Sequence, residues 1–277
     1  MTTWLITGIS RGLGKALAMA ALAQGDTVVG TVRTAPISLD SEKGTLHVLN
    51  VDLADGAAAE AAVKEAFQRF GQIDVIVNNA GYGLLGALEH ATDAEVERLF
   101  AVDVFAPFKI MRAALPYLRD QGSGHIINIT SIAGRAPSTG SALYSAAKSA
   151  LEGLSAALSL EVASLGIKVT AVAPGAFRTD FLSGQSIQRS GEAHAAYAGT
   201  IGKSDAAFDA AAGHQLGDPQ RAANAIMALV RSDNPPLHLL LGSDALRRMR
   251  TKLDQVVDEI DAWETTTLST DYPEDGK

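Results

Sequence analysis

The sequence predicts an α/β fold, in which one doubly wound domain is built on a parallel sheet of about seven strands. Two observations lead to this prediction. Short β-rich runs alternate with helical segments along the 277-residue chain, and neither a Pro- or Gly-rich linker nor an internal repeat interrupts them. Strands that alternate with helices form right-handed βαβ units, whose parallel sheet is covered on both faces. Hydrophobic residues make up 47% of the chain, which is enough for a large core.

The elements follow from local patterns. Strands are predicted from buried apolar runs at 4–8, 27–32, 46–51, 74–78, 126–129, 168–172 and 237–241. Helices are predicted from helical spacing in Ala-, Leu-, Glu- and Lys-rich segments at 13–23, 57–70, 94–119, 142–164 and 219–231. The domain is predicted to span residues 1–264, and the polar residues 265–277 are predicted to form a loose tail.

Two further stretches stand apart. Residues 181–215 are rich in Gly, Ala and Ser without a clear strand, and they follow Pro174-Gly175 at the carboxyl end of a predicted strand. Doubly wound sheets bind ligands at that end, so a substrate lid is predicted, with a disordered insert as the alternative. Residues 244–263 predict an amphipathic helix that packs on the core or on a neighbouring subunit.

Composition excludes several classes. The net charge of −8 argues against nucleic-acid binding, which needs clustered Lys and Arg. Without cysteine there is no disulfide, thiolate nucleophile or thiolate metal site, and the six histidines form no metal motif. No apolar stretch is long enough for a membrane span, and no signal peptide precedes the first strand. The chain is expected to be cytoplasmic, without a metal, nucleic-acid or membrane partner.

A glycine-rich segment, Thr7-Gly-Ile-Ser-Arg-Gly-Leu-Gly14, lies between the first strand and the first helix. Glycines there let the backbone approach a pyrophosphate, which a helix N-terminus favours. The spacing is GxxxGxG rather than GxGxxG, so an ordinary turn is the alternative. The second strand ends at Arg33 without an acidic residue, and Arg11 lies in the glycine loop. Arginines accommodate the 2′-phosphate of NADP, so NADP(H) is predicted over NAD(H). Alternatively, Arg33 is a surface residue and Arg11 caps a helix.

Ser131, Tyr144 and Lys148 predict an acid–base site. Tyr144 and Lys148 are four residues apart and share one helical face. A nearby ammonium lowers the pKa of a phenol, and a serine hydroxyl can hydrogen-bond the same substrate oxygen. The alternative is a solvated helix face.

These motifs, with Asn78-Asn-Ala-Gly81 and Pro174-Gly175 in order, resemble the short-chain dehydrogenase/reductase family, which has a Rossmann-type fold. The similarity covers positions 3 to about 180. Gly217-Asp-Pro219 and residues 235–242 are similar to NADP-linked carbonyl reductases and 17β-hydroxysteroid-dehydrogenase-like members. The resemblance implies that Tyr144 is the general acid or base, that Lys148 lowers its pKa and that Ser131 positions the substrate oxygen. It also implies cofactor contacts from Gly8, Ser10, Arg11, Gly12, Leu13, Gly14, Arg33, Asp52, Leu53, Asn79, Ala80, Gly81, Tyr144, Lys148, Pro174, Gly175 and Thr179.

One position departs from the family pattern. Asp103 stands where the family has a fourth polar site residue, an asparagine. A carboxylate would hold Lys148 charged and oppose the Tyr144 phenolate. The hypothesis is that Asp103 takes over the proton-relay position, and a purely structural role is the alternative.

The predicted function is hydride transfer between NADP(H) and a carbonyl or secondary-alcohol substrate. A non-catalytic NADP-binding sensor and an epimerase or dehydratase are the alternatives. An apolar wall is expected from Tyr82, Leu84, Leu85, Phe177, Phe181 and Leu182. The long helices at 94–119 and 142–164 resemble those that pair in family oligomers, so a homodimer or homotetramer is expected. Substrate, direction and stereochemistry do not follow from the fold.

Overall fold

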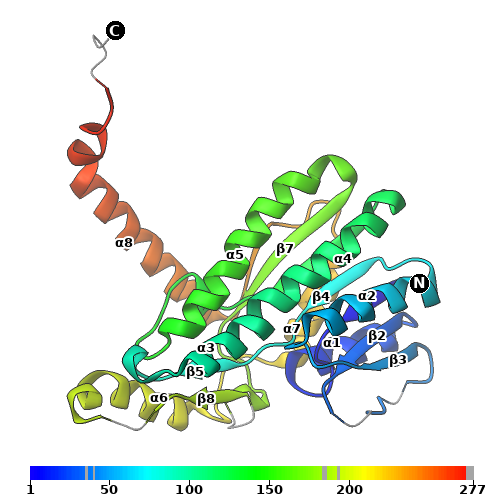
Figure 1. Ribbon diagram of the computed structural model, residues 1–277, viewed down its shortest axis with the longest axis horizontal. Coiled ribbons are helices and arrows are strands. Elements are labelled where there is room, and N and C mark those ends of the chain that lie inside the picture. Colours follow the sequence, from blue (N-terminus) through cyan, green and yellow to red (C-terminus); the bar gives the residue numbers. More distant parts are fainter. Residues whose placement is uncertain (35–36, 40, 183–185, 192–193, 273–277) are drawn as a thin grey trace.

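The computed structural model describes residues 1–34, 37–39, 41–182, 186–191 and 194–272. Its centre is a seven-stranded sheet in the order β3-β2-β1-β4-β6-β7-β9, and every neighbouring pair is parallel (Figure 1). The strands are β1 (Thr3–Ile6), β2 (Thr27–Val32), β3 (Thr45–Asn50), β4 (Val75–Asn78), β6 (Gly124–Ile129), β7 (Ile167–Pro174) and β9 (His238–Leu241). The predicted doubly wound fold with seven parallel strands is confirmed.

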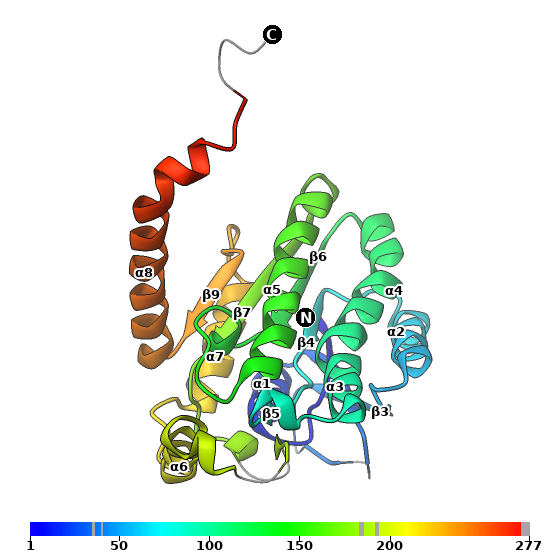
Figure 2. The ribbon, with the colours of Figure 1, turned by 60° about the vertical axis from the view of Figure 1, so that its left-hand side comes forward.

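Helices cover both faces of the sheet, which forms the middle layer of three (Figure 2). One face buries its side chains against α2 (Gly56–Phe70), α4 (Ala106–Gln121) and α5 (Ala142–Val162). The other face packs against α1 (Gly12–Ala23) and α7 (Pro219–Val230). Successive strand residues point to opposite faces, so Leu5 belongs to the first core and its neighbours Trp4 and Ile6 to the second.

The strand order reverses between β1 and β4. The chain runs outward from β1 to β2 and β3, returns to β4 beside β1, and then continues through β6, β7 and β9 on the other side. In open α/β sheets such a reversal opens a crevice at the carboxyl ends of the strands, where ligands bind. The glycine loop after β1 and Asn79 after β4 both lie at this place.

The predicted helix at 94–119 is interrupted. It comprises α3 (Asp93–Phe100), a wide π turn over Ala101–Phe105, and α4. A π turn places one extra residue in the helix and is frequent at functional sites. Asp103 is the middle residue of this turn, so the departure from regular helix falls on the residue that departs from the family pattern.

The region 181–215 contains more structure than the sequence predicts. The three-residue strand β8 (Ile187–Arg189) pairs in parallel with β5 (Gly83–Leu85), and α6 (Lys203–Ala211) follows it. The prediction of a segment without a strand is therefore wrong. A three-residue strand held by a distant partner carries too few residues for a period-2 pattern. Positions 183–185 and 192–193 of the proposed lid lie outside the described residues.

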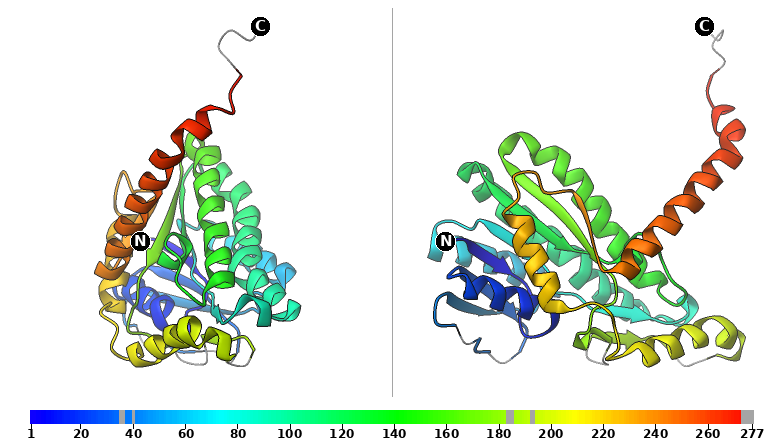
Figure 3. Two further views of the ribbon diagram at one scale, coloured as in Figure 1. Left: turned by 90° about the vertical axis from the view of Figure 1, so that its left-hand side faces the viewer. Right: turned by 180° about the vertical axis from the view of Figure 1, so that it is seen from behind.

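The C-terminal helix is longer than predicted. α8 spans Ser243–Leu268 and extends away from the sheet beyond β9 (Figure 3). The predicted loose tail from residue 265 is wrong for 265–268, because neither Gly nor Pro stops the helix there. Positions 273–277 lie outside the described residues.

Candidate functional site

The glycine loop between β1 and α1 depends on glycine at defined positions. Gly8 and Gly12 have φ of 72° and 58°, in the left-handed region that favours glycine. A side chain at Gly14 would overlap the carbonyl oxygen of Gly8 and the side-chain amide of Asn79. The loop therefore needs the three predicted glycines for its own conformation.

Asn79 and Thr7 fix this loop to the end of β4. The Asn79 side-chain amide donates to the carbonyl oxygens of Thr7, at 2.8 Å, and Gly8, at 3.1 Å. The Thr7 hydroxyl accepts the backbone N–H groups of Asn79 and Ala80, both at 2.9 Å. The loop is thus held at the strand reversal, with the N-terminus of α1 directly behind it.

The two predicted NADP-selecting arginines lie at this edge of the sheet. Arg11 is the N-cap residue of α1, and Arg33 is exposed directly after β2. β2 reaches the loop through Thr31, whose carbonyl oxygen accepts the N–H groups of Gly8 and Ile9, both at 3.1 Å. The positions suit contact with the adenosine end of a dinucleotide.

A cavity of about 440 Å³ opens beside the loop. The glycine loop forms one wall through Gly12, and the segment after β7 forms another through Thr179. Gln215 also lines it, with only 4% of its surface exposed. Its amide nitrogen and oxygen have no hydrogen-bond partner within the described part of the chain. The full lining is Gly12, Arg178, Thr179, Asp180, Ala212, Gly213, Gln215 and Pro219.

Sequence reasoning did not identify Gln215, because a single glutamine carries no motif. A buried amide without a partner is unfavourable unless a ligand or water satisfies it. The donor and acceptor of Gln215, together with the loop of positive-φ glycines, fit a polar dinucleotide. The cavity and the adjoining glycine loop therefore suit a polar, phosphate-bearing ligand.

The other predicted cofactor residues differ in exposure: some lie at the surface and others are buried in the core or packed against other segments. Asp52 is exposed after β3 and accepts the N–H of Ala54 at 3.0 Å, whereas Leu53 is buried in the core. Gly175 lies against Asp244 of α8, and a side chain there would overlap that carboxylate. Asp244 also accepts the N–H of Ala176 at 2.8 Å. Ser10 is exposed in the loop, Leu13 packs on the core beside it, and Pro174 ends β7.

The acid–base residues come together on α5 and the two segments that face it. Tyr144 and Lys148 are buried on one face of α5, and Ser131, two residues after β6, lies close enough to Tyr144 to lower the pKa of its phenol. The Lys148 ammonium lies 5.8 Å from the centre of the Tyr144 ring. It donates to the carbonyl oxygen of Ile129 at 3.3 Å. The predicted trio therefore forms one cluster.

Asp103 completes this cluster from the π turn. Its Oδ2 lies 3.0 Å from Lys148 Nζ, and its Oδ1 accepts the N–H of Tyr82 at 3.1 Å. Asp103 is fully buried. A side chain at Gly81 would come within 2.8 Å of Asp103 Oδ2 and 3.2 Å of Lys148 Nζ. Gly81 therefore leaves space for the ion pair.

Burial and charge set the protonation of the cluster. Burial raises the pKa of Tyr144, and the Asp103 carboxylate raises it further, while Lys148 and the nearby Ser131 side chain lower it; the net shift is upward. Burial alone lowers the pKa of Lys148, but Asp103, Tyr144 and Glu152 together outweigh this effect and raise it. Tyr144 is thus a protonated phenol beside a charged ammonium. Lys148 lowers and Asp103 raises the Tyr144 pKa as the sequence predicts, and burial, the largest effect, makes the net shift upward.

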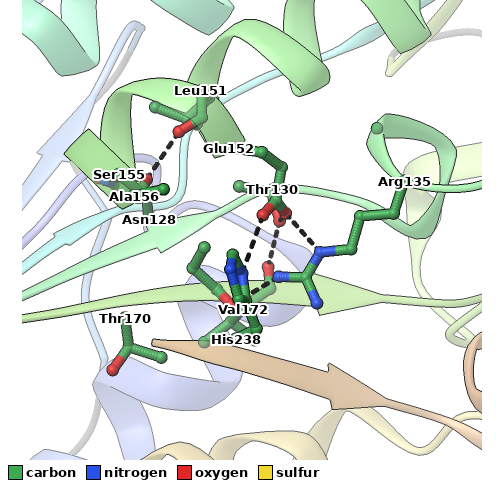
Figure 4. Close-up of polar contacts among 12 residues, drawn as sticks. Asn128, Thr130, Arg135, Leu151, Glu152, Ser155, Ala156, Thr170, Val172 and His238 are labelled. Carbon is green, nitrogen blue, oxygen red and sulfur yellow. Dashed lines mark hydrogen bonds and ion pairs between the residues drawn. The ribbon is translucent and has the colours of Figure 1, made fainter. Parts of the chain in front are cut away.

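A second charged network begins one helical turn beyond Lys148. Glu152 pairs with Arg135 Nε at 2.9 Å and with His238 Nδ1 at 3.4 Å, and it accepts the hydroxyl of Thr130 (Figure 4). Arg135 also donates to the carbonyl oxygen of Ala171 at 3.0 Å. The network joins α5 to β7, to β9 and to the short helix that begins after Ser131. The only part of this network that the sequence indicates is the position of Glu152, which lies four residues after Lys148 and therefore on the same helix face as Tyr144 and Lys148.

The expected apolar wall is present only in part. The ring of Phe181 lies 6.0 Å from that of Tyr144. Leu84 and Leu85 are core residues, and Phe177 packs beside Gly217. Tyr82 has its pKa raised to about 12, by burial first and then by Asp103. Leu182 has a side chain outside the described part of the structure.

Metal and membrane features are absent from the described residues. They contain no group of three His, Asp or Glu side chains that could hold a metal ion. None of the helices in the described ranges combines the length and the apolar character needed to cross a bilayer.

The chain is similar to known oxidoreductases. A family model described as short chain dehydrogenase matches residues 2–190. The oxidoreductase BOA17 of Botryotinia fuckeliana is 38% identical over 250 residues, covering 88% of this chain and 89% of that protein. A crystal structure of a short-chain dehydrogenase from Streptomyces avermitilis has a TM-score of 0.88 at 38% identity, covering 98% of this chain and all of that one. A short-chain dehydrogenase from Sphingobium yanoikuyae in complex with NADPH has a TM-score of 0.70 at 25% identity, covering 100% and 98% of the two chains.

The family model covers more than half of the chain, including both the glycine loop and the Ser131, Tyr144 and Lys148 cluster. The similarity to the Botryotinia and Streptomyces proteins continues beyond it through most of the remaining residues. We conclude that this chain belongs to the short-chain dehydrogenase/reductase family and is a nicotinamide-dependent oxidoreductase.

Proposed function

We propose that the protein is an NADP(H)-dependent carbonyl reductase or alcohol dehydrogenase that acts on a fairly apolar ketone, aldehyde or secondary alcohol. The observation that carries this proposal is the cluster in which Tyr144 shares one face of α5 with Lys148 and lies close to Ser131, while Asp103 pairs with Lys148 behind them. A cofactor-binding protein without a reaction has no use for such a cluster.

The residues have separate roles in the reduction. Tyr144 donates its phenolic proton to the carbonyl oxygen of the substrate, and its raised pKa keeps that proton available at neutral pH. Ser131 hydrogen-bonds the same oxygen and orients it. Lys148, held by Asp103, stabilises the phenolate that remains. Bound NADP(H) supplies the hydride for the carbonyl carbon. In alcohol oxidation the proton returns to Tyr144.

The proposed cofactor contacts follow the cavity and the glycine loop. Gly8, Gly12 and the N-terminus of α1 would hold the diphosphate, and Thr179 and Gln215 would hydrogen-bond the part that enters the cavity. Arg11 and Arg33 would bind the 2′-phosphate that distinguishes NADP from NAD.

The proposal is tested with a panel of ketones, steroids, sugars and acyl thioesters, each with NADPH or NADH. We expect NADPH turnover of at least one apolar carbonyl, and we expect Tyr144→Phe to abolish turnover while the Kd for NADPH stays within about twofold. Binding of NADPH without any turnover would favour the sensor. Cofactor retained through dialysis, with substrate converted but no net redox change, would favour the epimerase or dehydratase.

Cofactor preference has its own test. Arg33→Asp removes a charge-assisted contact and adds repulsion, so kcat/KM with NADPH should fall about 10- to 100-fold while that with NADH changes little or rises. Arg69→Asp, on exposed α2, is the matched control. Equal loss with both cofactors would contradict the assignment of Arg33.

A further inference from the structure

Most of α8 lies outside the body of the molecule. Its first turns contact the body through buried Ala245, through Met249 beside Ile132 and Ala136, and through Arg248, which donates to the carbonyl oxygen of Ala136. Beyond these turns the helix projects away from the sheet, and no other helix or strand of the described residues lies beside it (Figures 1 and 3). Residues 257–268 are all exposed.

The projecting helix carries an apolar stripe. Exposed fractions are 42% for Leu246, 50% for Leu253, 53% for Val257, 61% for Ile260 and 66% for Trp263. These side chains belong to a heptad pattern, in which apolar residues occupy both the a and d positions through almost three repeats. The a and d positions are Leu246, Met249, Leu253, Val256, Ile260 and Trp263; Met249 packs on the body of its own chain, so the stripe open to a partner consists of the other five, and Val257 borders it.

Charges are segregated along the same helix. Four basic residues fall within positions 247–252, and five acidic residues fall within positions 254–264. This order opposes the helix dipole, which favours acids at the N-terminal end and bases at the C-terminal end. A second helix in the opposite direction would place acids beside bases in both halves. The residues are Arg247, Arg248, Arg250 and Lys252, and Asp254, Asp258, Glu259, Asp261 and Glu264.

We propose that α8 docks in antiparallel orientation against α8 of a second copy of this chain. Maximal overlap pairs Leu246 with Trp263 of the second copy and Leu253 with Val256 of the second copy. In that register Lys252 lies beside Glu259 of the second copy. Because the two helices are related by a twofold axis, the same ion pair occurs a second time with the two copies exchanged. The five acidic residues of the outer half oppose docking on an anionic membrane.

The test measures self-association of the full chain by sedimentation velocity over a range of concentrations. Leu253→Glu/Ile260→Glu places two charges in the stripe, and the dissociation constant should rise at least tenfold. Thr251→Glu/Ala262→Glu puts the same charges on the opposite, exposed face and should leave it unchanged. Circular dichroism of each variant checks folding. A monomeric wild-type chain, or unchanged association of the stripe variant, would overturn the proposal.

Charge exchange tests the orientation. Lys252→Glu and Glu259→Lys should each weaken association by about two- to tenfold, and the double exchange should restore it. In a parallel pair Glu259 would instead flank Glu264 of the second copy, so Glu259→Lys would strengthen association and overturn the antiparallel arrangement. If the chain did not self-associate but bound phosphatidylcholine/phosphatidylglycerol vesicles through the stripe, the proposal would be overturned, and the partner of α8 would be a membrane surface rather than a second copy.

Discussion

At the scale of single residues, Asp103 is the position that most affects the chemistry. It lies 3.0 Å from Lys148 and raises the pKa of Tyr144, after the larger effect of burial. Asp103→Asn keeps the shape of the side chain and removes its charge. We therefore expect the pKa of Tyr144 to fall, because burial then acts without the neighbouring carboxylate.

The measurement is the pH dependence of kcat/KM. In alcohol oxidation Tyr144 must be deprotonated, so activity should rise at lower pH in Asp103→Asn than in the wild type. In carbonyl reduction it must be protonated, so the alkaline loss of activity should also begin at lower pH. Asp93→Asn, in the first turn of α3 but outside the site, should leave both profiles in place. Coincident wild-type and Asp103→Asn profiles would leave Asp103 with a structural role alone.

Gln215 provides a second test at this scale. Gln215→Leu puts an apolar side chain of similar size into the cavity lining and removes the amide, which has no hydrogen-bond partner among the described residues. The Kd for NADPH, measured by calorimetry, should rise about tenfold, as for the loss of one hydrogen bond of about 1 kcal/mol or slightly more. Thermal stability should hold or improve, because an unsatisfied buried amide has been removed. Unchanged NADPH affinity would exclude Gln215 from the cofactor site.

At the scale of elements, one face of α5 organises the site. Tyr144, Lys148 and Glu152 follow one another at intervals of four residues, so a single helix carries the proton donor, its ammonium and the centre of a second network. Glu152 pairs with Arg135 and with His238 (Figure 4). Because Arg135 belongs to the segment that follows Ser131, its ion pair with Glu152 holds this segment against α5.

Glu152→Gln should lower the free energy of unfolding by about 3 kcal/mol, since it leaves the Arg135 charge buried without its partner. The value is obtained from chemical denaturation. Glu161→Gln, on the exposed side of the same helix near its end, should change it by less than about 0.5 kcal/mol. A loss as small as that of the control would mean that water, rather than Glu152, balances Arg135.

The strands and long helices could be predicted from sequence because their apolar periodicities extend over enough residues. The glycine loop and the Tyr144-to-Lys148 spacing are local, so they too could be identified. Gln215 could not, since its role depends on a cavity that distant segments form. Glu152 could be placed on the face of α5 that carries Tyr144 and Lys148, but its partners Arg135 and His238 could not be predicted. The opposing effects of Lys148 and Asp103 on the Tyr144 pKa could be predicted, but the net direction could not, because burial depends on the folded surroundings.

At the scale of the whole molecule, a histidine links the strands on which the site is built. His125 on β6 is buried, and its Nε2 lies 2.9 Å from the Thr170 hydroxyl on β7, which itself donates to Pro236. Because that hydroxyl already donates to the Pro236 carbonyl oxygen, the Nε2–H of His125 is the donor to Thr170. Burial, with a smaller effect from Lys168, lowers the pKa of His125 to about 4.

Stability should therefore decrease in acid. The unfolded histidine titrates near its ordinary pKa of about 6.5, so between that pH and about pH 4 the unfolded chain binds the extra proton. We expect His125 alone to reduce the free energy of unfolding by about 2 kcal/mol from pH 7 to pH 5. Denaturation of wild type and His125→Phe at both pH values gives this contribution as a difference. A variant with the same pH dependence as the wild type would refute it.

The wide turn at Ala101–Phe105 has a consequence for changes in chain length. Because a π turn accommodates one extra residue without turning the flanking helices, removing one residue from it would restore a regular helix and leave α3 and α4 on the faces that they now bury. Leu99 and the buried side chains of α4 would keep their core clusters. The side chains of the turn itself would shift, and Asp103 would leave its position beside Lys148. A homologue one residue shorter between α3 and α4 should therefore keep the same core but lose this acid–base cluster.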